Sequence, residues 1–181
     1  MSRRLLAAGA CAALLLTGCL VPERFTARAA FAADGSYQYS YAGTAVHTLT
    51  AGQLAKRDTL APQAKPDTER ETRKPKRYDL SVEGKRQRGQ ALDLAGVLRV
   101  QTGPDGVLTL QAGKLDDKEK ASMSKLGIKL DGTLSVTVPI SAEVISHNAT
   151  STPSFFGLLG TYSWKIGSLE QRPEMKIRFK Q

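Results

Sequence analysis

The stretch from Arg24 to Val46 reads RFTARAAFAADGSYQYSYAGTAV and alternates apolar with polar residues on both sides of an Asp-Gly pair. Alternation with a period of two is typical of a half-buried β-strand, and Asp-Gly between two such runs is typical of a hairpin turn. A two-residue turn would place the aromatic residues of the two strands on opposite faces. A three-residue loop, Asp34-Gly35-Ser36, pairs Phe31 with Tyr39 on one face, so we expect this loop.

The same pattern predicts two further hairpins and a final pair of strands. Asp131-Gly132-Thr133 lies between two sets of even-numbered apolar residues, at 126–130 and at 134–140. Gly103-Pro104-Asp105-Gly106 lies between apolar residues at 94, 98 and 100 and others at 108 and 110. Both segments predict turns. The last strands are expected at 161–166, with Tyr162 and Trp164 on one face, and at 175–179.

Two short helices are indicated by capping patterns, in which Thr or Asp is followed three residues later by Gln or Glu. One opens at Thr50 and runs to about Asp58; the other opens at Asp116 and runs to about Lys125. A mainly antiparallel β-sheet built from hairpins, with two short helices packed on it, predicts an α+β fold. We expect one such domain over residues 24–181, with a charged, proline-containing loop at about 60–77.

The N-terminal residues have the pattern of a bacterial lipoprotein signal peptide. Arg3 and Arg4 form a positively charged region, and the apolar run Leu5–Leu16 is shorter than the ~20 residues that span a bilayer. The run leads into Thr17-Gly18-Cys19, which completes a lipobox: an aliphatic residue, two small residues and the cysteine that becomes acylated. The alternative is an ordinary secretory signal that ends in a chance cysteine.

Lipidation has consequences for the rest of the chain. We expect residues 1–18 to be cleaved, residues 19–23 to form a lipidated tether, and Cys19 to carry diacylglycerol and an N-acyl chain. The mature chain would then have no other cysteine, which excludes a disulfide framework and a thiolate metal site. Loss of Arg3 and Arg4 would lower the formal charge from +9 to +7. Such a basic protein outside the cell favours anionic lipid or acidic polymer over nucleic acid as a partner.

A basic surface is one candidate for contact with an anionic membrane. Its residues gather around the charged loop, although five interspersed acidic residues equally favour a solvated loop. The candidate basic residues are Arg73, Lys74, Lys76, Arg77, Lys85, Arg86 and Arg88.

A second candidate surface is aromatic and apolar. The segment Ser154–Gly160 is rich in large apolar residues although it connects two expected strands, which is unusual for a surface connection. The alternative is that it folds inward and caps the sheet. With the aromatic residues of the next strand, it supplies our candidate ligand or membrane contacts: Phe155, Phe156, Leu158, Leu159, Tyr162 and Trp164.

Motifs of catalysis and metal binding are not found in the sequence. It has no Gly-x-Ser-x-Gly elbow, His-Glu-x-x-His, Walker loop or dinucleotide fingerprint. The two histidines, His47 and His147, are far apart and have no partner pattern around them. We therefore expect no enzymatic activity, no metal and no cofactor other than the covalent lipid.

Two stretches of the sequence resemble known lipoproteins. The opening Cys19-Leu20-x-Pro22, followed by 25–41 with its Asp-Gly hairpin, is similar to uncharacterised proteobacterial lipoproteins. The stretch from Val136 through His147-Asn148 to Trp164 resembles the LppM-like lipoproteins, which implies a lipid-binding role in the envelope. In lipoproteins generally, a residue such as Leu20 after the lipidated cysteine implies the outer membrane, facing the periplasm.

Together these features predict a non-catalytic envelope lipoprotein that is anchored to the membrane by its lipid. We expect its domain to bind a lipid or another envelope component through aromatic residues of the sheet. The alternative is a structural or assembly partner of another envelope protein, which it would contact through sheet edges and the basic region.

Overall fold

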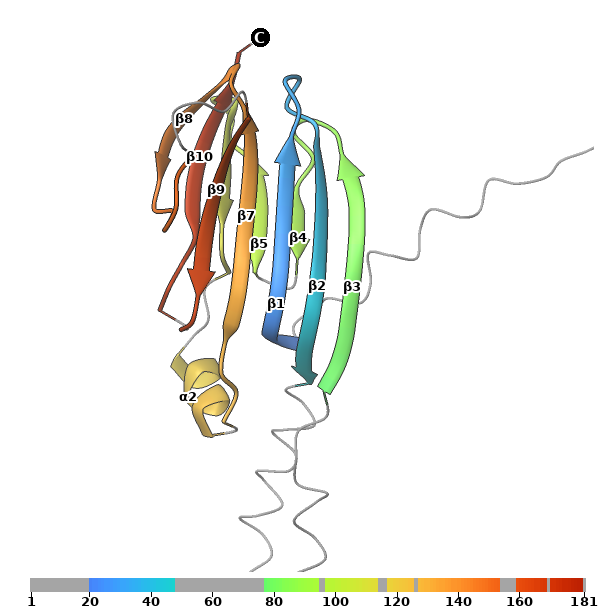
Figure 1. The fold of residues 1–181 in the computed structure, drawn as a ribbon, viewed down its shortest axis with the longest axis vertical. Coiled ribbons are helices and arrows are strands. Elements are labelled where there is room, and N and C mark those ends of the chain that lie inside the picture. The colour runs from blue at the N-terminus through green and yellow to red at the C-terminus, as the bar shows by residue number, and fades with distance from the viewer. Residues whose placement is uncertain are drawn as a thin grey trace, which may run out of the picture.

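Two β-sheets pack face to face in this computed structural model, which describes residues 20–47, 77–94, 97–113, 117–125, 127–153, 159–168 and 170–180. Each sheet has five strands, and the strands of both run along the long axis of the molecule (Figure 1). The first sheet has the order β3-β2-β1-β7-β9 and the second β4-β5-β6-β10-β8. We call them sheet A and sheet B.

Sheet A is built outward from its central strand. Its strands are β1 (Leu20–Phe31), β2 (Tyr37–His47), β3 (Arg77–Arg86), β7 (Asp131–Pro139) and β9 (Leu159–Ile166). The strands β1, β2 and β3 form an antiparallel meander, whereas β1 and β7 are parallel. The parallel pair needs a long crossover, and here the chain passes through sheet B before it returns as β7.

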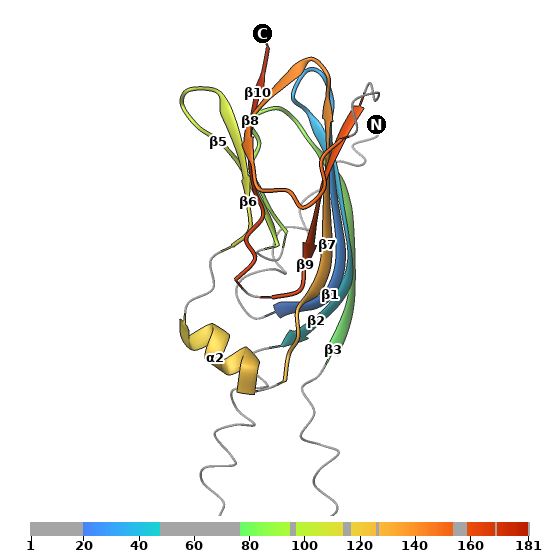
Figure 2. The ribbon, with the colours of Figure 1, turned by 60° about the vertical axis from the view of Figure 1, so that its left-hand side comes forward.

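Sheet B consists of shorter strands. They are β4 (Leu92–Leu94), β5 (Leu98–Thr102), β6 (Val107–Gln111), β8 (Ala142–His147) and β10 (Glu174–Phe179). All of its pairings are antiparallel. The helix α2 (Asp117–Lys125) lies between β6 and β7 in the chain, at the end of the sandwich where β1 and β7 begin (Figure 2). We call this end the base and the opposite one the far end.

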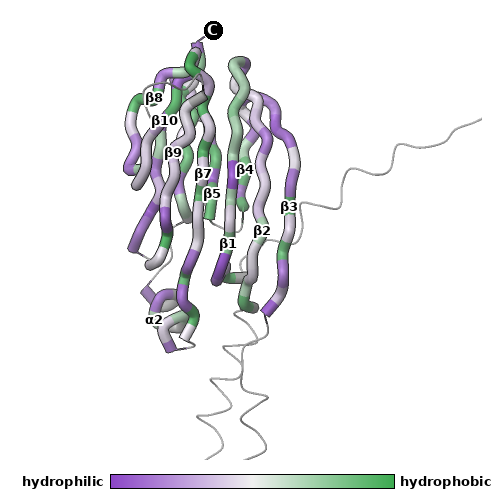
Figure 3. The backbone as a smooth tube through the Cα atoms, in the orientation of Figure 1, coloured by the Kyte–Doolittle hydropathy of each residue, from purple (hydrophilic) through white to green (hydrophobic). Residues whose placement is uncertain are grey.

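Apolar side chains from both sheets fill the space between them. Hydrophobic and hydrophilic residues alternate along the strands (Figure 3), and the hydrophobic set faces inward. Sheet A contributes Ala27, Ala29, Phe31, Tyr39, Val136 and Trp164 among others, and sheet B contributes Leu98, Val100, Leu110, Met175, Ile177 and Phe179. The packed core is the main source of stability, because burial of apolar surface is the dominant favourable term in folding.

Phe25 occupies a special place at the centre of sheet A. It is paired with Gly43 on β2 and with Gly132 on β7, so a glycine faces it in each neighbouring strand. A Cβ added to Gly132 would lie 2.2 Å from Cζ of Phe25, and one added to Gly43 would lie 2.3 Å from the carbonyl oxygen of Arg24. The ring thus fills the space that a side chain at Gly132 would occupy, as an aromatic residue does when it covers a strand glycine, whereas at Gly43 it is the main chain of β1 that leaves no room.

This packing overturns the hairpin that we expected at Asp131-Gly132-Thr133. These residues are the first three of β7, and Gly132 is there because Phe25 leaves no room for a side chain. The residues before them, 127–130, form a connection from α2 and not a strand. The even-numbered residues Leu134 and Val138 face the core as expected, but Ile140 lies beyond the strand and is exposed.

The hairpin between β1 and β2 has a three-residue loop, as expected, but the loop begins one residue earlier in the sequence. Ala32 N–H donates to the carbonyl oxygen of Ser36 at 2.8 Å, so the loop is Ala33-Asp34-Gly35 and Phe31 pairs with Tyr37, not Tyr39. The reason is that a three-residue loop of this kind requires a left-handed last residue, and Gly35 supplies it with φ of 82°. The two aromatic sets still share a face, because the shift is by two residues.

The hairpin between β5 and β6 is confirmed and uses the same device. Gly103 N–H donates to Val107 O at 2.9 Å, and Gly106 has φ of 72°. Asp105 Oδ1 accepts the N–H of Val107 at 3.2 Å, as Asp34 Oδ1 accepts that of Ser36 at 2.9 Å. The last two strands are also confirmed, as β9 and β10.

The expected α+β class is wrong, because the described chain is mainly β. The predicted helix at Asp116–Lys125 exists as α2, but it is the one helix among the described residues. It has nine residues and sends Met123 into a small cluster with Val46 and Ile128. The other predicted helix, Thr50 to Asp58, and the charged loop before Arg77 lie outside the described residues.

Gly132→Ala tests the role of the glycine beside Phe25. We expect it to lower the free energy of unfolding by about 1–3 kcal/mol, since the added methyl group overpacks a buried ring. Gly167→Ala is the control, because its added Cβ meets only Gln171 Oε1 at 3.9 Å. Urea unfolding should show a change within about 0.5 kcal/mol for the control. Equal effects of the two substitutions would contradict this account.

Tyr41 and Tyr37 provide a matched pair for the cost of a buried hydroxyl. Burial raises the pKa of both phenols to about 12. Tyr37 donates to Gln90 O at 2.7 Å, whereas Tyr41 Oη has no hydrogen-bond partner among the described residues. Tyr41→Phe should raise the free energy of unfolding by about 1 kcal/mol, and Tyr37→Phe should lower it by about 1 kcal/mol. If urea unfolding showed a similar loss of unfolding free energy in both variants, the Tyr41 hydroxyl would have a hydrogen-bond partner in solution.

Candidate functional site

The sequence-predicted contact residues are only partly within the described chain. Cys19, three candidate basic residues (Arg73, Lys74 and Lys76) and three candidate apolar contacts (Phe155, Phe156 and Leu158) lie outside it. Leu159 is the first residue of β9, and only its backbone is described. Tyr162, Trp164 and the remaining basic residues are described, and they fall in different parts of the fold.

Tyr162 lines a cleft where sheet A and sheet B separate at one edge of the sandwich. The cleft has a volume of about 540 Å³ and is bordered by the ends of β7 and β9 from sheet A and by β8 from sheet B. Its aliphatic lining residues are Val138, Pro139, Ile140, Ala142, Val144 and Pro153. Its polar side chains are His147, Thr152 and Tyr162, and polar atoms make up the larger part of its accessible lining. This size is within the ~300–1,000 Å³ of small-molecule sites. We call it the edge cleft.

His147 and Tyr162 meet at the edge cleft from opposite sheets. Their ring centroids are 4.8 Å apart with a tilt of 59°. Ala149 N–H donates to His147 Nδ1 at 3.2 Å, so the proton of the neutral imidazole is on Nε2, which can donate to a ligand. Sequence reasoning treated His147 as isolated, because the strand that carries Tyr162 is brought beside it only by the packing of the sheets.

Trp164 is part of the core beneath the cleft and is only 4% exposed. Its indole N–H donates to Asn148 Oδ1 at 2.7 Å, and the same oxygen accepts the N–H of Glu174 at 2.8 Å. Asn148 Nδ2 also donates to Arg172 O at 2.6 Å. Asn148 therefore links β9 to the start of β10.

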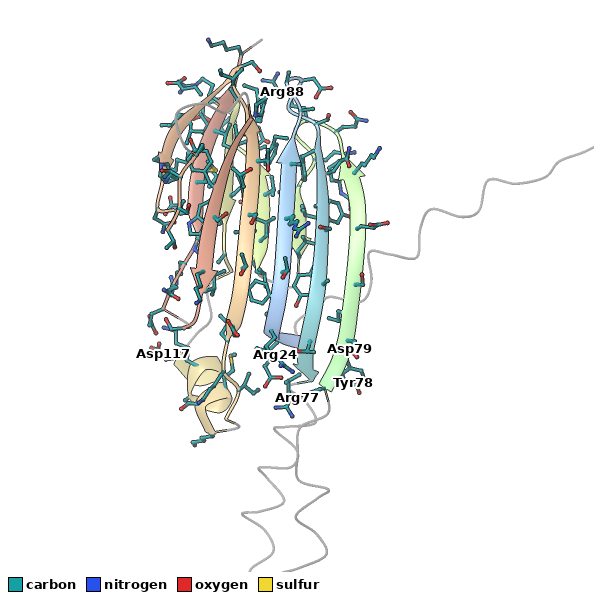
Figure 4. All side chains as sticks on the ribbon, viewed as in Figure 1. Arg24, Arg77, Tyr78, Asp79, Arg88 and Asp117 are labelled. Carbon is teal, nitrogen blue, oxygen red and sulfur yellow. The ribbon has the colours of Figure 1, made fainter. Side chains whose placement is uncertain are left out.

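The described basic residues do not form one surface. Arg77 starts β3 at the base, whereas Lys85, Arg86 and Arg88 are at the far end, and Figure 4 shows Arg77 and Arg88 at opposite ends of the molecule. The guanidinium of Arg86 lies 5.3 Å from the ring centroid of Tyr39, and Arg88 donates to Phe179 O at 3.3 Å. Because β3 is extended, these basic residues lie far apart in space although they are close in sequence.

Arg77 is held by a nearly buried carboxylate. Its Nε donates to Glu23 Oε2 at 2.7 Å and its Nη2 donates to Glu23 Oε1 at 2.9 Å. Glu23 lies at an irregularity in the pairing of β1 with β2, and the bidentate bond reaches across from β3. The hydrogen bonds from Arg77 hold the pKa of Glu23 below its ordinary value of 4.5, against the opposing effect of burial.

A second depression opens on the outer face of sheet A, near the base. It measures about 550 Å³, and its charged lining residues are Arg24, Asp79 and Asp131. Arg24 and Asp79 are labelled in Figure 4. No group of three His, Cys, Asp or Glu side chains in the described ranges is arranged to hold a metal ion. Within those ranges, no helix is long and apolar enough to cross a bilayer.

Removal of the Glu23 carboxylate tests the ion pair at the base. At pH 7, Glu23→Gln should lower the free energy of unfolding by about 1–3 kcal/mol, because it loses two charge-assisted hydrogen bonds. Since the folded pKa is depressed, this stabilisation is present above about pH 4.5 and is lost as the pH falls through the folded pKa. Urea titrations should therefore show that the difference in unfolding free energy between wild type and Glu23→Gln shrinks as the pH falls below 4.5.

Glu143→Gln is the matched control, because Glu143 forms an ion pair with Arg178 in which both side chains are more than half exposed. We expect a change of about 0–1 kcal/mol. A Glu23→Gln effect on the free energy of unfolding that is no larger than that of Glu143→Gln, or one that does not shrink as the pH falls below 4.5, would contradict the role of the pair.

Comparisons with known proteins were made for the whole chain. No protein-family model matches it, and no curated protein matches it. The resemblance to LppM-like lipoproteins therefore stays an expectation from the sequence, and the edge cleft is the best-defined candidate site.

Proposed function

We propose that this protein is a lipid-anchored lipoprotein of the cell envelope whose β-sandwich binds a lipid, or another envelope component with an apolar part, in the edge cleft. The observation that carries the proposal is the composition of the cleft. Aliphatic side chains from both sheets border it together with three polar side chains, His147, Thr152 and Tyr162, and its accessible lining is more polar than apolar, which suits a ligand with both a polar and an apolar part. Apolar walls with a few placed polar groups are typical of small-molecule sites.

The anchor follows from the lipobox. Two or more acyl chains give stable membrane attachment, because each buried CH₂ contributes ~0.8 kcal/mol. A diacylglyceryl Cys19 with an N-acyl chain would hold the protein without help from the folded domain. The outer membrane, facing the periplasm, is the location that Leu20 after this cysteine favours. The domain is then available for binding.

The exposed isoleucine at the mouth of the cleft supports an apolar ligand. Ile140 is 76% exposed in the turn between β7 and β8 and lines the cleft. A large aliphatic side chain in water gains free energy, about 25 cal/mol per Å² of area buried, when a ligand covers it. The described residues that line the cleft include no carboxylate, lysine or arginine, and we propose binding without catalysis.

The second candidate is a structural partner of another envelope protein. Ile145 favours it, since this residue is 42% exposed on β8, the edge strand of sheet B. Unpaired edge strands can accept a strand from another chain. The edge strand of sheet A, β3, presents the exposed charges Asp79, Glu83 and Lys85, which guard it against such pairing. In-cell crosslinking that yields one reproducible protein partner through β8 would favour this candidate.

Two exposed isoleucines, one in the turn that joins β7 to β8 and one on β8, test the lipid proposal. Ile140→Ser should weaken binding of a phospholipid or free fatty acid several-fold, because it removes part of the apolar wall. Ile145→Ser is the control, since this equally branched side chain is exposed on β8 but does not line the cleft. The measurement is native mass spectrometry of the detergent-released protein with envelope phospholipids.

Three outcomes distinguish the candidates. Retained lipid in wild type and in the Ile145 variant, but not in the Ile140 variant, supports the cleft. Equal loss of lipid in both variants would point to non-specific adsorption on exposed isoleucines. Spectra free of lipid for wild type across phosphatidylethanolamine, phosphatidylglycerol and fatty acid would overturn the proposal.

A further inference from the structure

The folded domain begins immediately after the proposed lipidation site. β1 starts at Leu20, which is paired with His47, and the next residue, Val21, is paired with Val46. Only one peptide unit, about 3.8 Å between Cα atoms, separates Cys19 from a paired strand residue. A lipid on Cys19 would therefore have no length of unpaired chain between it and the sheet.

The first residues of β1 are fixed in place by packing and by charge. Val21 packs against the cluster of Val46, Met123 and Ile128, which joins β1, β2 and α2. Two residues later, Glu23 is bonded to Arg77 at 2.7 and 2.9 Å. Peeling this segment away to make a tether would break the cluster and leave a nearly buried carboxylate without its partner, which is costly.

The surface around this point is polar with mixed charges. α2 exposes Asp117 and Lys125, and the connection that follows exposes Lys129. Tyr78, next to Arg77 at the start of β3, is 38% exposed and lies at the base (Figure 4). A tyrosine among charged residues suits the headgroup region, where an apolar body and a polar tip are both accommodated.

The edge cleft lies at the other end of the same strands. β7 runs parallel to β1, with Ala30 opposite Thr137, and the cleft is lined by the residues that follow, Val138 to Ile140. Beyond the irregularity at Glu23, where β1 follows the long axis, Arg24 and Ala30 are six residues apart, which at a rise of ~3.3 Å per residue is about 20 Å. The ribbon shows the ends of β7 and β1 side by side, away from α2 (Figures 1 and 2).

We propose, on the basis of the lipid anchor at Cys19, that the base of the sandwich faces the headgroups of the anchoring bilayer and that the edge cleft is held about 20 Å away from it. The short connection enforces this orientation, and the polar base makes it compatible with headgroup contact. The cleft consequently receives its ligand from the side opposite the anchoring membrane, not from that membrane directly.

Three single-cysteine variants of the full-length lipidated protein test the orientation. Because Cys19 is acylated and Cys11 is removed with the leader, each introduced cysteine is the one free thiol. Lys129→Cys reports on the base, Ser81→Cys on the middle of β3 and Ala33→Cys on the turn at the far end; all three residues are exposed. Each is labelled with a small environment-sensitive fluorophore and bound to preformed vesicles of phosphatidylethanolamine and phosphatidylglycerol that contain a nitroxide-headgroup lipid.

The expected result is several-fold stronger quenching at position 129 than at position 33, with position 81 in between. Strongest quenching at 81 would mean that the domain lies on the side of sheet A, and strongest quenching at 33 would mean that it is inverted. Equal quenching at all three would mean that it tumbles. Each of these outcomes overturns the proposed orientation.

A linker variant tests the physical cause. Ten Gly and Ser residues inserted between Cys19 and Leu20 should bring the quenching at 129 close to that at 33, because the domain is released from the bilayer while the lipid is kept. If the difference in quenching between positions 129 and 33 did not change, the role of the short connection would be overturned. Flotation with the vesicles, scored before quenching, separates the two hypotheses: protein that does not float refutes the anchor, whereas floating protein without a contrast refutes only the orientation.

Discussion

The contact of Phe25 with the two glycines beside it is the constraint on which sheet A depends. β1 is the central strand, and every other strand of the sheet is aligned directly or indirectly on it. Gly43 and Gly132 must be opposite the ring at the same time, because any side chain at either position would collide with Phe25 or with its backbone. This three-residue arrangement specifies the register on both sides of β1, whereas most core positions tolerate several apolar residues.

The direction of the strands gives the molecule two distinct ends. β1 and β7 both begin at the base, where α2 and the ion pair of Glu23 with Arg77 close the sandwich. Both finish at the far end, which carries tight turns and the start of the edge cleft. Because β1 and β7 run in the same direction, both begin at the end nearest Cys19 and both finish at the end that holds the candidate site.

The candidate site could be anticipated only in part. Tyr162, Trp164 and Ile166 alternate correctly, so the sequence predicts that they share the inner face of β9. Alternation does not tell which of them a second sheet covers. Trp164 is buried and donates to Asn148, while Tyr162 lies against His147 of β8, the edge strand of sheet B, and so becomes part of the cleft. His147 had no local signal, because its neighbour Tyr162 is on another sheet.

Features that depend on neighbouring residues along the chain were determined by the sequence alone. These are the alternating strands, the Asp-Gly loop between β5 and β6, the existence of the helix α2 and the lipobox pattern before β1, since hydrophobic period, turn geometry and capping patterns act over a few residues. Tertiary structure alone decided that Asp131-Gly132 begins a strand, that β1 and β7 are parallel, and that basic residues close in sequence lie at opposite ends. The physical reason is that these outcomes depend on what a distant segment places beside each residue: a ring against Gly132, a strand against β1, and an extended β3 between Arg77 and Arg88.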